Sequence, residues 1–273
     1  NAMATKNAKL VEKLEQAGAI ILGKTNVTEF NGVFDANLPE GYSSLGGQVL
    51  LPSDTDKTPA GSSAGSAAAT AVGLAALTIG LETSTDTAQI IAPAGVAGVV
   101  ALKPTVGLVS RTGILPVAKS QDSPGPITRT VYDAALTLEA IAGPDPDDEA
   151  TSGTPSSPDY LSGLSPTALS GKRVAVISST TAPYPTVVSA IQALGATTIV
   201  TSIGTPSPNP PSIVMIEFKR DLNAYLLNLN IRKSGTKSLQ EIIAYNDANP
   251  VEGLKYQQRE LLSAQAIDLS DPA

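Results

Sequence analysis

The sequence predicts an α/β fold in which a mixed, largely parallel sheet is flanked by helices. Short apolar runs, each long enough for one buried strand, alternate with longer stretches whose apolar residues recur at helical spacing. Hydrophobic residues make up 42% of the chain and charged residues 16%, which is the balance of a globular protein and not of a disordered one.

Seven helices are expected from apolar periodicity and from the residues that end it. The helix at 7–18 ends at a glycine, and the helix at 130–142 ends before a Gly-Pro pair. The segment 62–76 is small on every face, which suits a helix that packs closely inside a large domain. The other helices are expected at 187–196, 213–229, 238–248 and from about 253 onward.

Five strands are expected from apolar runs, and those at 19–22 and 96–102 are expected to be buried. AIIL precedes a Gly-Lys-Thr-Asn turn, VAGVVAL follows the Ala-rich segment, and RVAVIS and TTIVTSI restart the alternation in the second half. The expected strands span 19–22, 96–102, 106–110, 173–178 and 197–203.

The chain is long enough for one large domain or two small ones, and we expect a single domain over 4–273. Its first α/β part spans 4–142 and its second 172–273. Between them, 143–171 is rich in Pro, Ser, Asp and Gly. Such a stretch reads as a surface excursion, with a domain linker as the alternative.

Cysteine and histidine are both absent, which removes several chemistries. The chain can form no disulfide, offers no thiolate nucleophile or histidine base, and lacks the ligands of a Cys/His zinc site. We therefore expect no metal and no cofactor. Any catalysis has to use hydroxyls, lysines, tyrosines and carboxylates.

The charge balance and the apolar runs bear on partners and location. A net charge of −7 without a basic patch argues against nucleic acid. The most apolar run, AVGLAALTIGL, is far shorter than the roughly 20 residues that cross a bilayer, so no membrane span is expected. The opening Asn-Ala-Met resembles a tag remnant and no signal peptide is visible, so a cytoplasmic location is favoured.

The segment 58–95 carries the strongest functional signal. A Gly-Ser-Ser turn before an Ala-rich helix places backbone N–H groups and hydroxyls where developing negative charge is stabilised. The same pattern is also that of an ordinary helix N-cap. Taken alone, it does not decide between an acyl-transfer site and a structural turn.

The order of motifs resembles the amidase signature family, and within it the peptide-amidase branch. AGAIILGKTNVTEF precedes AGSSAGSAAA, GLETSTD, APAGVAGVVALKPTVGLVSRTGILP and SQDSPGPITRTVYDAALTLEAIAG, and EFKRDLNAYL and SLQEIIAYNDANP follow. The resemblance covers nearly the whole chain, which looks shortened at both ends. It implies hydrolysis of amide C–N bonds by a Ser–cis-Ser–Lys triad, in which a neutral lysine activates a bridging serine and that serine activates a nucleophilic one.

By this resemblance Ser62 takes the cis-Ser position, with Ser63 beside it. The nucleophile position falls on Asp86 when counted from Ser62, and on Gln89 when counted back from Pro-Ala, because about three extra residues lie between the two anchors. Neither residue is a serine, and the nearby Ser84 is the remaining candidate nucleophile.

The loop that would hold the oxyanion by its backbone N–H groups comprises Thr83, Thr85, Asp86, Thr87 and Ala88. A less favoured chemistry uses Ser84 or Thr85 as nucleophile with Ser62 as relay and Glu82 or Asp86 nearby. The simpler interpretation of these two carboxylates is that they cap the next segment.

The triad lysine has no counterpart in this chain, because the family carries it upstream of the segment that matches residue 4. Lys24 and Lys103 match other family positions. We therefore expect an amidase-family protein that is catalytically impaired in this chain. The alternative is a non-catalytic binding or scaffold domain that keeps the amidase pocket.

Further expectations concern ligands and assembly. The ligand would be a small amide or a peptide amide, with specificity from the loop 34–50 and the C-terminal helices. Tyr42, Tyr132 and Tyr245 are candidates to line the pocket or to be half-buried. Exposed sheet edges predict a homo-oligomer.

Overall fold

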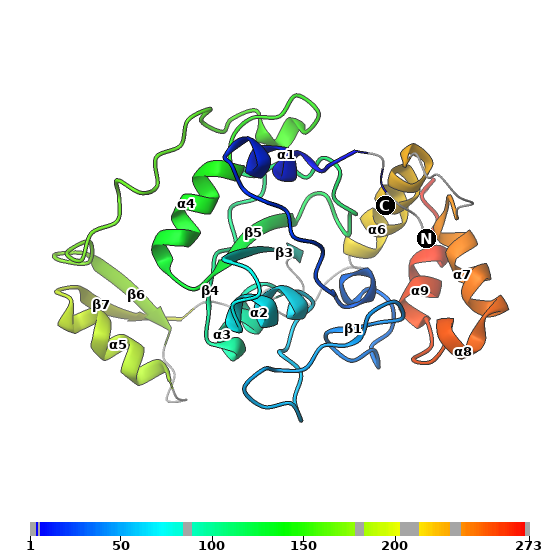
Figure 1. The fold of residues 1–273 in the computed structure, drawn as a ribbon, viewed down its shortest axis with the longest axis horizontal. Coiled ribbons are helices and arrows are strands. Elements are labelled where there is room, and N and C mark those ends of the chain that lie inside the picture. The colour runs from blue at the N-terminus through cyan, green and yellow to red at the C-terminus, as the bar shows by residue number, and fades with distance from the viewer. Residues whose placement is uncertain are drawn as a thin grey trace. The chain divides into compact units, whose positions relative to one another are not determined.

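The computed structural model describes residues 4, 6–83, 89–177, 183–202, 213–229 and 236–270 (Figure 1). It divides into two compact units, one of 1–158 with 211–273 and the other of 159–210. The boundary at 159 falls inside the polar stretch 143–171.

The first unit contains two small sheets and most of the helices. Its helical segments are α1 (Lys9–Gln16), η1 (Glu29–Gly32), α2 (Ala64–Ala71), α3 (Ile91–Ala97), α4 (Val131–Ile141), η2 (Glu149–Thr151), α6 (Ile213–Asn228), α7 (Leu239–Ala248), α8 (Pro250–Gly253) and α9 (Arg259–Ala266). Its strands are β1 (Tyr42–Ser43), β2 (Gly47–Gln48), β3 (Leu77–Thr83), β4 (Val100–Ala101) and β5 (Asp122–Thr128). Helix α4 lies on one face of the β3–β5–β4 sheet, and α2 and α3 lie on the other (Figure 1).

The second unit is a strand–helix–strand arrangement. Strands β6 (Arg173–Ile177) and β7 (Thr197–Thr201) pair in parallel, and α5 (Tyr184–Ala193) connects them. This is the short parallel crossover that the alternating pattern of the second half predicts.

The α/β class is confirmed, but the described pairings are not largely parallel. Strands β3 and β4 are joined through α3 and run in the same direction, as a strand–helix–strand sequence favours. Strand β5 lies between them and is antiparallel to both. The sequence pattern gives the direction of β3 and β4 but not the insertion of a third strand between them.

Strand β5 was not among the expected strands, and its sequence, DSPGPIT, contains two prolines. Its geometry explains why they are tolerated. The Pro126 carbonyl accepts from the Leu102 N–H, so Pro126, and with it Pro124, faces the side of β4. That neighbour is only two residues long, so few ladder bonds are lost. Gly125 admits the close approach, since a Cβ there would lie 2.1 Å from the Leu102 carbonyl oxygen.

Three expected strands are corrected by the structure. Residues 19–22 form no strand and pair with no described strand, and Ile20 and Leu22 are 84% and 75% exposed. In 96–102 only Val100–Ala101 is a strand, because α3 runs on to a left-handed Gly98. Segment 106–110 forms one isolated bridge, from Val109 to Ala142.

The principal hydrophobic core packs the loop 30–38 against the C-terminal helices α6, α7 and α9. Phe34 stacks with Phe30, and the edge of Phe30 meets Phe218 of α6. Asp35 accepts bonds from the Arg259 guanidinium at 2.6 and 2.8 Å, which ties this loop to α9. The Arg259 side chain thereby holds the pKa of Asp35 well below its usual range.

Candidate functional site

The site begins at the N-terminus of α2. Ala60 and Gly61 both have left-handed backbone angles, with φ of 59° and 66°, and lead into Ser62. The Ser62 carbonyl accepts from the Thr28 N–H at 3.0 Å, so its backbone is fixed. Its hydroxyl is buried and has no hydrogen-bond partner among the described residues. A buried, unpartnered hydroxyl is an uncommon feature that calls for an explanation.

The other hydroxyls of α2 have a structural task. Ser63 Oγ accepts from the Leu81 N–H at 3.1 Å, and Ser66 Oγ donates to the Ile79 carbonyl at 2.8 Å. Thr70 Oγ1 continues the row with a 2.9 Å bond to the Thr78 hydroxyl. These side chains share one face of α2, and Ser63 and Ser66 satisfy backbone groups on the edge of β3 that β5 does not pair.

Close packing of α2 explains its small residues, as the sequence predicted. A Cβ on Gly65 would lie 2.3 Å from the Asn26 carbonyl oxygen, which itself accepts from the Gly65 N–H at 3.1 Å. A Cβ on Gly80 would lie 2.9 Å from Ser63 Oγ. Glycine at both positions therefore lets β3 and the 24–28 turn approach the helix.

Gln89 completes the cover of this strand edge. Its backbone carbonyl accepts from the Ser63 N–H at 3.0 Å. Its side-chain oxygen accepts from the Thr83 N–H at 2.7 Å and from Asn31 Nδ2 at 2.8 Å, while its Nε2 donates to the Asn31 carbonyl at 3.1 Å. The next residue, Ile90, donates its N–H to Glu82 at 2.8 Å. Glu82 thus caps the segment that follows, as expected.

Asn31 reaches this position through a strained turn. Phe30 and Asn31 have φ of 48° and 57°, and Gly32 follows with φ of 96°. Consecutive left-handed residues other than glycine are costly, and such strain concentrates at functional sites. The aromatic contacts of Phe30 with Phe34 and Phe218 anchor the turn in the core.

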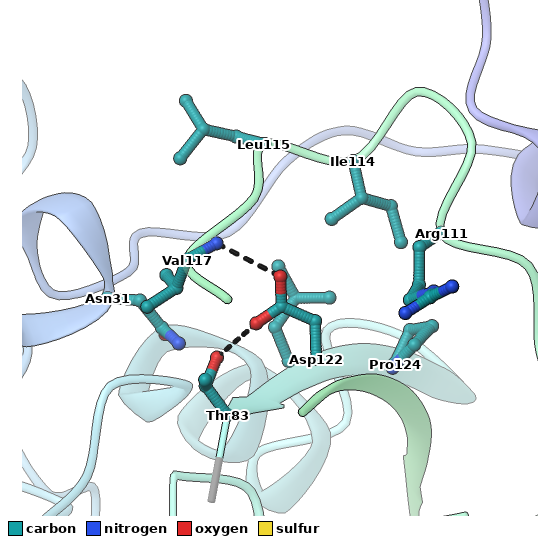
Figure 2. A pocket seen from close by; sticks show the side chains of 9 residues that line it. Asn31, Thr83, Arg111, Ile114, Leu115, Val117, Asp122 and Pro124 are labelled. Carbon is teal, nitrogen blue, oxygen red and sulfur yellow. Dashed lines mark hydrogen bonds between the residues drawn. The ribbon is translucent and has the colours of Figure 1, made fainter. Parts of the chain in front are cut away.

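A small cavity of about 10 Å³ lies beside Asn31 and Thr83 (Figure 2). Figure 2 shows Asp122 at its centre, where it accepts from Thr83 Oγ1 at 2.5 Å and from the Val117 N–H at 3.0 Å. The Ala118 N–H also donates to this carboxylate, at 3.0 Å. Burial raises the pKa of Asp122 above its usual value although these donors oppose the rise.

A model of the Amidase family matches residues 1–261. The chain belongs to the Amidase family. A probable amidase of Arabidopsis thaliana is 35% identical over 277 residues, which cover 97% of this chain and 53% of that protein. A putative amidase of Arthroderma benhamiae is 41% identical over 177 residues, which cover 64% of this chain and 29% of that protein.

Solved amidases share the fold. Native peptide amidase from Stenotrophomonas maltophilia superimposes with a TM-score of 0.87 at 36% identity, covering 98% of this chain and 56% of that one. An amidase family protein from Bacillus anthracis gives a TM-score of 0.91 at 32% identity, covering 98% and 55%. The predicted resemblance to the amidase signature family and its peptide-amidase branch is confirmed. The chain spans about half the length of these relatives.

The site residues expected from the amidase resemblance are only partly described. Ser63 and Thr83 both donate their backbone N–H groups to Gln89, and Ser62 directly precedes Ser63. Five further candidates lie outside the described residues: Ser84, Thr85, Asp86, Thr87 and Ala88. Lys24 is exposed, and the Lys103 ammonium donates to the Pro104 carbonyl at 3.2 Å.

A larger cleft of about 550 Å³ lies in the same unit of the amidase chain. Lys6, Lys119 and Tyr225 line it, together with Arg111 and Asp148. Arg111 holds Asp148 in a partly buried ion pair at 2.5 Å, and this pair lowers the pKa of Asp148. The three tyrosines expected as possible pocket residues do not line this cleft. Tyr132 and Tyr245 are exposed, and Tyr42 packs on Tyr256 at 4.8 Å.

Sequence reasoning missed Asn31 and Asp122. The Asn31-Gly32 pair is a turn signal that favours left-handed backbone angles, but it does not indicate that the Asn31 side chain contacts Gln89, and Asp122 begins a strand that was not expected. Over the described ranges, no group of three or more Asp, Glu, His or Cys side chains could hold a metal ion. Within the same ranges, no helix has the length and apolar character needed to cross a membrane.

Proposed function

We propose that this chain carries the amide-binding site of an amidase that acts on a small amide or a peptide amide, with Ser62 in the bridging cis-Ser role. Membership of the Amidase family supports the reaction class. The peptide-amidase neighbours support the ligand class, and one of them is in complex with the competitive inhibitor chymostatin.

We further propose that the chain as it stands hydrolyses amides poorly or not at all. The observation that carries this is the Ser62 hydroxyl, which is buried and without a partner in the described part of the chain. A bridging serine has to receive a proton from the nucleophile and pass one to a base. No described lysine forms a hydrogen bond with Ser62. Gln89, one of the two positions at which the family resemblance places the nucleophile, lies between β3 and α3 and is not a serine.

The absence of a base that contacts Ser62 would have a large effect on rate. The nucleophile's oxygen attacks the amide carbon while its proton passes through the bridging serine to the base. The base gives that proton to the amine, which leaves as the C–N bond breaks, and water then hydrolyses the acyl-enzyme to the acid and restores the serine. Members of such a triad act as one unit, so removing one costs on the order of 10⁴- to 10⁶-fold.

A serine-directed fluorophosphonate probe tests this proposal. The folded chain and its Ser62→Ala and Ser84→Ala variants would be incubated with the probe and with simple amides, and any adduct mapped by mass spectrometry. We expect no adduct and no turnover. An adduct on Ser84 or Ser62 that accompanies measurable hydrolysis, and that disappears in the matching variant, would show that an active nucleophile is present.

The non-catalytic alternative is a binding or scaffold domain that keeps the pocket, and the buried unpartnered Ser62 favours it over a working enzyme. It predicts amide binding without turnover. Four expectations stay predictions: a single domain over 4–273, self-association through exposed sheet edges, a cytoplasmic location and the absence of nucleic-acid partners.

A further inference from the structure

The carboxamide of Gln89 lies in a pocket that recognises both of its ends. Its oxygen accepts two hydrogen bonds, from Asn31 Nδ2 at 2.8 Å and from the Thr83 N–H at 2.7 Å. Its nitrogen donates to the Asn31 carbonyl at 3.1 Å. Gln89 is only 3% exposed, so these bonds are made away from water. The pocket therefore presents two donors to an amide oxygen and an acceptor to an amide nitrogen.

We propose that Asn31 and Thr83 form a carboxamide-binding pocket and that Gln89 fills it as an internal ligand. The pocket's amide chemistry rests on the contacts of Gln89 alone, and only its meaning for catalysis rests on the proposed function. Two donors that converge on one carbonyl oxygen also polarise an amide, which is how acyl-transfer sites activate their substrates. While Gln89 occupies the pocket, an external amide cannot use these donors.

Two buried oxygen atoms, one on a residue of the pocket and one on a neighbouring turn, have no hydrogen-bond partner among the described residues. Asn31 Oδ1 is buried and has no hydrogen-bond partner among the described residues, and the same is true of Ser62 Oγ. Ser62 precedes Ser63, whose N–H holds the Gln89 backbone. The cavity of about 10 Å³ in Figure 2 is lined by Asn31 and Thr83 themselves. Buried polar atoms without partners are uncommon, and one of these two belongs to the Asn31 amide that itself donates to the Gln89 carboxamide.

The backbone conformation at Asn31 supports the pocket independently of the hydrogen bonds of Gln89. Asn31 and the preceding Phe30 both adopt left-handed backbone angles, which a purely structural cap would not need. The core contacts of Phe30 with Phe34 and Phe218 hold this turn in place. The fold therefore aims the Asn31 side chain and carbonyl together at one point, where the carboxamide lies.

A simpler explanation is that Gln89 only caps the edge of β3, as Ser63 and Ser66 do. The two explanations differ when the Gln89 side chain is removed. An edge cap leaves an unsatisfied N–H that any small polar molecule can serve. A carboxamide pocket prefers an amide over a carboxylate, because a carboxylate would place negative charge against the Asn31 carbonyl.

Chemical rescue of a Gln89→Ala variant provides the test. This variant should be less stable than the parent chain, and propionamide should restore stability with millimolar affinity. At ten times its dissociation constant, a ligand lowers the unfolding constant about elevenfold. For a chain of this size that is a rise in Tm of roughly 2–3 °C. Propionate and 1-propanol should give less than a third of this rise.

Gln258→Ala is the matched control. Gln258 is also buried, its oxygen accepts from Asn246 Nδ2 at 2.9 Å, and its Nε2 donates to Asp247 at 2.9 Å. Propionamide should raise the Tm of this variant by no more than it raises the Tm of the parent chain. Equal rescue of both variants, or equal rescue of Gln89→Ala by amide and carboxylate, would overturn the proposal.

A Gln89→Glu variant keeps the proposal testable if Gln89→Ala does not fold. Only a protonated glutamic acid can donate to the Asn31 carbonyl as Nε2 does, so the pocket should raise the pKa of this group. Its stability relative to the parent should be highest below the unfolded pKa of about 4.3 and should fall as pH rises through the folded pKa. A difference in stability that does not vary with pH would refute the pocket. Neither test requires hydrolysis, so a failed activity assay does not decide it.

Discussion

Replacing Ser62 by alanine should leave the free energy of unfolding unchanged or raise it slightly, whereas replacing Ser63 by alanine should lower it. The two serines are adjacent and equally buried, at 3% exposure each. They differ only in their partners. Ser62 Oγ has none among the described residues, and Ser63 Oγ accepts from the Leu81 N–H at 3.1 Å and donates to the Leu81 carbonyl at 3.3 Å.

The magnitudes follow from these contacts. Ser63→Ala leaves an N–H of β3 without a partner at the covered edge of the strand, which costs about 1–3 kcal/mol. Ser62→Ala removes a buried hydroxyl whose desolvation no hydrogen bond offsets, and the cavity left by one oxygen atom is small. We expect a change between zero and a gain of about 1 kcal/mol.

Urea denaturation of both variants, followed by circular dichroism, measures the difference. With a slope of about 3 kcal/mol/M, a loss of about 1.5 kcal/mol lowers the midpoint by roughly 0.5 M. A loss of stability in Ser62→Ala as large as that in Ser63→Ala would refute this expectation. The Ser62 hydroxyl would then have a hydrogen-bond partner, and its isolation could no longer explain an impaired proton relay.

Three further changes have defined outcomes. Gly65→Ala should cost about 2–4 kcal/mol, because its Cβ would lie 2.3 Å from a backbone oxygen, whereas Gly95→Ala in α3 meets nothing within 4 Å and should gain up to about 1 kcal/mol in the same urea assay; equal effects would contradict the packing. Arg259→Met should lower the free energy of unfolding at pH 7, since it removes the guanidinium that pairs with the buried Asp35 carboxylate and leaves that carboxylate only backbone N–H donors. Asp35 has a lowered pKa, so its contribution is present above the unfolded value and lost as pH falls, and the difference between parent and variant should shrink from pH 7 to pH 3; a constant difference would argue against the pair. Ile20→Lys should reduce self-association in sedimentation, because Ile20 is 84% exposed in a segment that pairs with no described strand; a parent chain that is already monomeric at all concentrations would exclude the effect.

The helices were the most predictable part of the fold. Apolar spacing located α1, α4, α6 and α7, and side-chain caps fix the starts of two of them. Thr130 Oγ1 accepts from the Asp133 N–H at 3.0 Å, and Ser238 Oγ accepts from the Glu241 N–H at 3.2 Å. These signals are local, so the sequence alone carries them.

The strands were less predictable because their partners lie far away in the chain. The apolar residues at 19–22 resemble a buried strand, yet the described chain offers them no neighbour. Conversely, β5 contains two prolines and still pairs along its length with β3, because the proline nitrogens face the short β4. Whether a segment pairs depends on which edge is available, and no residue type encodes that.

The site shows the same division between local and distant information. Ser62 was proposed from the motif around it, because the Gly-Ser-Ser turn and the helix behind it are contiguous. Asn31 was not, since its role depends on a left-handed turn that Phe218 stabilises from a helix almost two hundred residues later. Gln89 was noted only as a counting position, and its contacts required the structure.

The edge of β3 links the stability of this chain to its chemistry. Ser66, Ser63 and Gln89 satisfy successive backbone groups at Ile79, Leu81 and Thr83 along that edge. The first two bonds come from α2 and are fixed by its close packing. The third comes from a side chain that is itself an amide, in the chemical class on which the family acts. If stability alone had shaped this edge, another hydroxyl at the third position would have sufficed, as it does at the first two. A carboxamide there, held at both ends by Asn31 and Thr83, is what an amide-binding pocket would hold when closed by its own chain.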